Sequence, residues 1–201
     1  MNYSQIAILF LQGTLVAFTI LLLFKLRKQL GIGTLFACLG LFQFVQVFLS
    51  STVYVSITDN FIVSPGSSVF FTASLFAILL IYIKEDASET KRIIYALFII
   101  NVLMTILLET FGWNFKDDST YNPHNLSTKL FDVNARVIFV GALALLLDSL
   151  LLIIIFEFIS RHVKSLFLRI LLTMLFVVSF DTILFSTLAF WEFEKFSSIL
   201  N

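Results

Sequence analysis

Long runs of apolar residues, almost free of charge, constrain the fold of this chain more than any other feature. A helix needs about 20 consecutive apolar residues to cross the hydrocarbon core of a bilayer. Runs of this kind cover about residues 4–24, 32–57, 61–83, 93–112, 134–158 and 166–191. They are continuous rather than alternating, which argues against the strands of a transmembrane barrel. The sequence therefore predicts an all-α, polytopic transmembrane helical bundle of six spans, forming a single transmembrane domain over residues 1–201.

Composition supports a membrane protein and narrows the classes of partner. Apolar residues make up 59% of the chain and charged residues 13%, against about 45–50% and about 25% in soluble domains. The net charge is zero, so no basic field attracts nucleic acid. Cys38 is the single cysteine, which excludes an internal disulfide and a cysteine-based zinc site. We expect the lipid bilayer and a small-molecule ligand as partners, with no nucleic acid and no metal.

Lysine and arginine are distributed unevenly over the links between the apolar runs. Positive residues accumulate in short cytoplasmic loops. Four of them lie in or beside the fourth link or after the last run, namely Lys116, Lys129, Arg136 and Lys195. Nine lie in or beside the first, third and fifth links, namely Lys25, Arg27, Lys28, Lys84, Lys91, Arg92, Arg161, Lys164 and Arg169. This census predicts that the N-terminus lies outside and the basic links inside. We expect an integral protein of the bacterial inner membrane.

An even number of spans returns the C-terminal residues to the outside. Residues 192–201 have the pattern of a short amphipathic segment. We therefore expect a seventh span after Asn201, leading into the cytoplasm. The alternative is that residues 192–201 lie in the external interface as a terminal half-helix.

A belt of polar residues crosses the apolar runs near their middle. It contains the amides Gln43, Gln46 and Asn101 and the acids Asp148 and Asp181. Amides at this depth serve either as interhelical hydrogen-bond partners or as ligand contacts. Ionisable groups at the bilayer centre are costly and normally face a bundle interior or a wet cavity. For the two acids, the alternatives are work on a ligand or a proton, and structural pairing.

Arg136 opens the fifth run and joins the candidate ligand-binding set. It precedes Asp148 by twelve residues, about 18 Å along a helix axis, so the two side chains cannot meet directly. Its partner is either Asp132, four residues earlier, or a carboxylate supplied by another helix or by a ligand.

The sequence contains no enzymatic motif. It has no pair of metal-binding residues at i and i+4, no glycine-rich phosphate loop and no nucleophile elbow. Both histidines, His124 and His162, lie in links between the runs. We therefore expect no catalytic residue, no cofactor and no enzymatic activity in this chain.

Several segments resemble the vitamin-uptake-like family of transporters, whose best known members move queuosine precursors. The sixth run contains Ser179-Phe180-Asp181-Thr182-Ile183-Leu184-Phe185 and then Ala189-Phe190-Trp191, similar to the family's Asp-Thr pair and aromatic end. The fifth run begins with Ala135-Arg136, where the family has an arginine. The basic segment Lys91-Arg92-Ile93-Ile94-Tyr95 is like the family's link into the next span. The resemblance covers roughly residues 32–191.

The chain departs from the transporter pattern in ways that favour a sensor. Residues 76–83 carry no acid where the family usually has acidic residues, and an additional span precedes the matched region. Sensor modules of this kind are fused to histidine kinase or cyclase domains. The resemblance implies a membrane sensor that binds a small molecule in a mid-membrane cavity and passes the signal to a cytoplasmic output domain, with a homodimer as its expected assembly. The alternative is a secondary transporter of a vitamin- or queuosine-precursor-like substrate.

Overall fold

A computed structural model describes residues 3–58, 61–116, 121, 123 and 135–190. Within these residues, six helices are long and apolar enough to cross a membrane. The third of them begins as a π-helix, η1 (Gly66–Phe71), and continues as α3 (Thr72–Lys84). The other five are α1 (Tyr3–Leu30), α2 (Gly33–Thr52), α4 (Ala87–Lys116), α5 (Ala135–Ser160) and α6 (Leu166–Phe190). The predicted all-α bundle of six spans is confirmed, and the chain is an integral membrane protein.

Two helices extend beyond their apolar runs into charged sequence. The first run ends near residue 24, but α1 continues to Leu30 and carries basic residues in its last turn, where they complement the helix dipole. Gly31 then makes the turn into α2 with φ of 79°, a conformation that favours glycine. α4 begins at Ala87, six residues before the predicted start of its run. The Asp86 carboxylate accepts a hydrogen bond from the Glu89 N–H at 2.8 Å and so caps the start of the helix.

The link between the second and third spans differs from the prediction. The apolar runs indicated a helix to residue 57 and a new one from residue 61. Instead α2 ends at Thr52, and the strands β1 (Val55–Thr58) and β2 (Phe61–Val63) pair antiparallel, with Val55 opposite Val63. This segment is rich in β-branched residues, which favour strands. Hydropathy alone does not distinguish such a short apolar strand from helix.

The third span starts at a tight contact with α2. The Ser64 hydroxyl accepts a hydrogen bond from the Gly66 N–H at 3.2 Å and donates one to the Leu49 carbonyl at 3.1 Å. A β-carbon on Gly66 would lie 2.5 Å from the Gln46 carbonyl oxygen and 2.6 Å from the Ser50 nitrogen. Only glycine fits a backbone approach this close.

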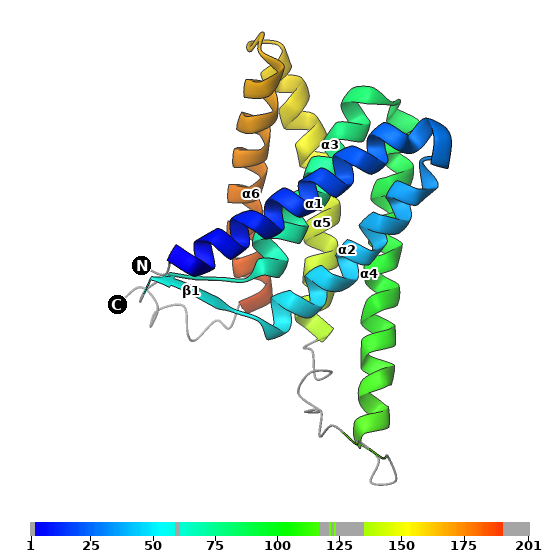
Figure 1. Cartoon of the computed structure of the whole chain (residues 1–201), viewed down its shortest axis with the longest axis vertical. Helices are drawn as coiled ribbons and strands as arrows, with labels where there is room; N and C mark the ends of the chain where they lie inside the picture. Colours follow the sequence, from blue (N-terminus) through cyan, green and yellow to red (C-terminus); the bar gives the residue numbers. More distant parts are fainter. Residues whose placement is uncertain (1–2, 59–60, 117–120, 122, 124–134, 191–201) are drawn as a thin grey trace.

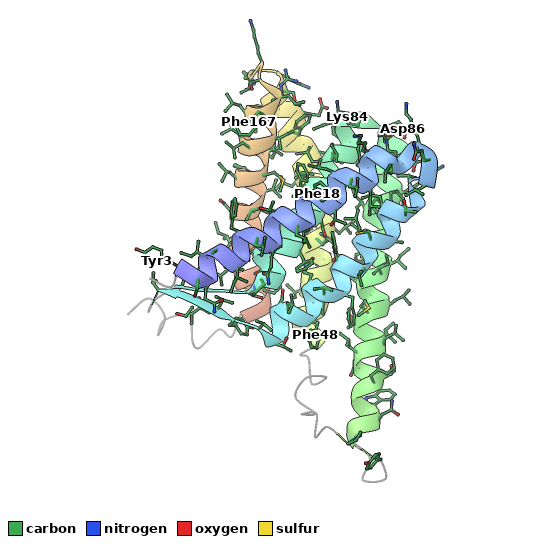
Figure 2. All side chains as sticks on the ribbon, in the orientation of Figure 1. Tyr3, Phe18, Phe48, Lys84, Asp86 and Phe167 are labelled. Atoms are coloured by element: carbon green, nitrogen blue, oxygen red, sulfur yellow. The ribbon has the colours of Figure 1, made fainter. Side chains whose placement is uncertain are left out.

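The core of the bundle lies around α3. This helix contacts each of the other five, and its residues Leu75, Ile78, Leu79 and Ile81 are fully buried. α1 and α2 diverge from their link and cross the face of the bundle, whereas α4, α5 and α6 run more upright (Figure 1). Phe18 of α1 and Phe167 of α6 are 63% and 72% exposed, as suits side chains that face lipid (Figure 2).

The links α1–α2, α3–α4 and α5–α6 lie at one end of the bundle, at the top of Figure 1, which we call the basic end. Lys84 and Asp86 mark it in Figure 2, while Tyr3 and Phe48 lie toward the other end. The nine basic residues of the census are therefore gathered at a single end of the molecule. Residues 192–201, for which the sequence predicts an amphipathic segment, lie outside the described residues.

Candidate ligand site

A hydrogen-bonded triad joins three helices in the middle of the bundle. The Gln43 amide of α2 donates to the Ser74 hydroxyl of α3 at 3.0 Å. Its carbonyl oxygen accepts from the Asn101 amide of α4 at 2.9 Å. Asn101 also donates to the Leu97 carbonyl at 3.1 Å, and the Ser74 hydroxyl to the Phe70 carbonyl at 2.9 Å. All three side chains are buried, so the interhelical role weighed for Gln43 and Asn101 is present in the fold.

The belt predicted from the sequence occupies a common depth. Counted from the basic end at 1.5 Å per helical residue, the belt residues of α2, α4, α5 and α6 and the Ser74 partner lie about 15–22 Å along their helices. A hydrocarbon core is about 30 Å thick, so these groups lie well inside the membrane-spanning part. Two polar sets result at this depth, the triad on α2, α3 and α4 and a pair of acids on α5 and α6.

The pair of acids consists of Asp148 on α5 and Asp181 on α6, two helices that pack extensively against each other. Each carboxyl group lies close enough to the other to influence its ionisation. Asp148 is fully buried, and Asp181 is partly exposed. An ionised carboxylate only accepts hydrogen bonds, so a direct bond between the two requires that one of them carry a proton. Neither oxygen of Asp148 has a donor among the described residues.

Gln46 does not join either polar set among the described residues, and the position of the Arg136 side chain is not described. The Gln46 side-chain carbonyl oxygen is buried without a partner among the described residues, and its backbone carbonyl faces Gly66. Arg136 lies in the first turn of α5, toward the end of the bundle opposite the basic end. Its side chain, like Asp132, lies outside the described part of the chain, so its predicted partner stays a prediction.

A cleft of about 330 Å³ opens between α1, α6 and the η1–α3 span. It contains none of the six residues proposed from the sequence, and its walls are mainly apolar. Its lining includes Gly13 and Ala17 of α1, Ala73 of α3 and Phe167 and Met174 of α6. Gly13 and Ala17 are small residues four apart on one face of α1, and a β-carbon at Gly13 would meet nothing within 4 Å. Small side chains at this spacing are the sequence signal from which the cleft could have been anticipated.

The same α6 face connects the cleft to the acid pair. Asp181 follows Met174 by seven residues, two helical turns along one face. Between them Val177 is fully buried. The cleft and Asp181 therefore lie on the same side of α6, with the cleft nearer the basic end.

Polar contacts at the basic end tie α3 to its neighbours. Arg27 of α1 forms an ion pair with Glu85, the residue that follows α3. The Tyr82 hydroxyl donates to the Glu157 carboxylate of α5 at 2.6 Å. Among the described residues, no group of three or more histidine, cysteine or acidic side chains could hold a metal ion.

Comparison with known proteins identifies the family. The family model described as vitamin uptake-like sensor matches residues 17–201. The chain belongs to the vitamin uptake-like sensor family. The match begins within α1 and covers every other span, which confirms the resemblance found in α4, α5 and α6. No curated protein and no solved structure showed significant similarity to this chain.

Proposed function

We propose that this chain is the membrane-embedded sensor domain of a signalling receptor and that it binds a small molecule between its helices. The observation that carries the proposal is the pair Asp148 and Asp181, whose carboxyl groups face each other deep in the bundle. Ionisable groups at this depth are expensive and are retained where they do functional work. Membership of the vitamin uptake-like sensor family supports the sensing role.

The proposed mechanism uses the polar groups at mid-depth and the helices that carry them. Ligand binding at Asp181 would change the packing between α5 and α6, and α5 is joined to α3 at the basic end through the Tyr82–Glu157 hydrogen bond. We propose that the basic end faces the cytoplasm, since it collects the positive residues. A cytoplasmic output domain would then receive the signal, and no catalytic step would take place on this chain.

The test is ligand-induced stabilisation of the purified chain in detergent. A library of small metabolites is screened by thermal unfolding against the wild type and against Asp181→Asn. We expect at least one compound to raise the Tm of the wild type in a saturable way and to do so less in the variant. A library that leaves the wild-type Tm unchanged throughout counts against the sensing proposal. Equal shifts in both proteins count against Asp181 as the contact.

Secondary transport is the second candidate, and the acid pair is the observation that favours it. Membrane-buried carboxyl groups serve as proton relays in transporters. Uptake of a bound compound into proteoliposomes under a pH gradient separates the two functions. Accumulation above that of empty liposomes supports transport, while binding without accumulation supports sensing.

A further inference from the structure

The charge balance around Asp148 and Asp181 narrows the class of ligand. α3, α4 and α6 all pack against α5, so a counter-ion for Asp148 would have to come from one of these helices. Among the described residues, the ion pairs are Arg27–Glu85 and Arg92–Glu89, and neither involves Asp148 or Asp181. The basic residue of α6, Arg169, lies one turn from the basic end, where its Nε donates to the Val163 carbonyl at 2.6 Å.

Burial of Asp148 is the second observation. Its side chain is fully buried, and neither of its two carboxyl oxygens has a hydrogen-bond donor among the described residues. A buried carboxylate without a partner is costly. The pair therefore requires positive charge from outside the described residues, as a proton or as a cationic group.

We propose that the Asp148–Asp181 pair binds the cationic nitrogen of the ligand, a protonated amine or amidine attached to an apolar body. This inference rests on the proposed sensing function and names its ligand class. One monocation, together with one retained proton, neutralises the two acids. An anionic ligand would add negative charge beside the pair, and a neutral ligand would leave the neutralisation of the pair to protons alone.

The exposure of the two acids gives the direction of approach. Asp181 is partly exposed on α6, whereas Asp148 lies behind it and is fully buried. The neighbours Phe180 and Ile183 on α6 are 39% and 69% exposed. A ligand that arrives along α6 therefore meets Asp181 first, with its apolar body beside these side chains and its nitrogen directed inward. Charge-assisted hydrogen bonds to both carboxyl groups would then hold the nitrogen.

The experiment measures thermal unfolding of the purified chain in detergent at constant ionic strength. The cationic probes are methylammonium, guanidinium and benzylammonium at millimolar concentrations, and benzyl alcohol and benzoate are the neutral and anionic matches. The control protein is Asp148→Asn/Asp181→Asn, which keeps the shape of both side chains and removes their charge. If that double variant does not fold, Asp181→Asn serves in its place.

At five times its Kd, at least one cationic probe is expected to raise the wild-type Tm by about 2–4 °C. The same probe should leave the Tm of the double variant unchanged, and benzyl alcohol and benzoate should have no effect on the wild type. Equal shifts in both proteins, or no shift with any of the three cations, overturn the inference. A neutral or anionic library compound that stabilises the wild type would overturn the cation assignment while leaving the sensing proposal in place.

Discussion

The contact between α2 and η1 makes Gly66→Ala the sharpest test of the described packing. The added β-carbon would lie 2.5 Å from the Gln46 carbonyl oxygen and 2.6 Å from the Ser50 nitrogen, both backbone atoms. Relaxed contacts of carbon lie near 3.5 Å, so the two backbones must separate by roughly 1 Å. Neither can do so by a rotamer change, because α2 and η1 are both held in helical hydrogen bonds.

Overpacking of this kind costs about 1–3 kcal/mol. Alanine returns about 0.5–1 kcal/mol of backbone entropy relative to glycine. We therefore expect a net loss of about 1–2 kcal/mol, which corresponds to a fall in Tm of about 2–8 °C for a chain of this size.

Two other glycines provide matched controls in the same assay, thermal unfolding in detergent followed by tryptophan fluorescence. At Gly13 of α1 a β-carbon meets nothing within 4 Å, so Gly13→Ala should keep or slightly raise the Tm. At Gly40 of α2 it meets the terminal methyl of Ile100 at 3.1 Å, and this flexible side chain can move aside. The expected order of Tm is Gly13→Ala, Gly40→Ala, Gly66→Ala from high to low. A Gly66→Ala protein as stable as the wild type would refute the described contact.

Three further substitutions test the polar contacts. Gln43→Leu should lower the free energy of unfolding by about 1–2 kcal/mol, because it removes two interhelical hydrogen bonds. Gln46→Leu should leave the free energy of unfolding unchanged or raise it, because the Gln46 side-chain oxygen is unpaired among the described residues. Comparable losses for the two variants in urea or SDS titrations would contradict this difference between the two glutamines. Tyr82→Phe should cost about 1 kcal/mol, the value of one hydrogen bond, and an unchanged unfolding midpoint would argue against that bond. Glu85→Gln should cost about 0.5 kcal/mol at low salt and less at high salt, since salt screens a partly exposed ion pair. A difference that salt does not reduce would show that the Arg27 contact is not electrostatic.

The spans and the depth of the polar residues were predictable from the sequence because both depend on local hydropathy. The hydrogen-bond partners of these polar residues were not predictable from the sequence, since they depend on which helices become neighbours. Gln43 and Asn101 were recognised as polar residues at mid-depth, but their hydrogen bond depends on the packing of α2 beside α4. A single serine such as Ser74 within an apolar run does not indicate by itself that it will bind a glutamine of another helix. The facing of Asp148 and Asp181 likewise follows from the packing of α5 on α6. The β1–β2 hairpin was missed because its apolar residues continue the hydropathy of the adjoining helices.

The π-helical start of the third span determines which side of α3 faces its neighbours. A π-helical turn holds more residues than an α-helical turn, and each α-helical residue rotates the chain by about 100°. Loss of one residue from Gly66–Phe71 would rewind this segment as an ordinary helix and rotate α3 by about that angle. Ser74 would then turn away from Gln43, and the fully buried face of α3 would turn with it. A change of one residue in the length of this segment would therefore disturb the membrane core more than most substitutions within it.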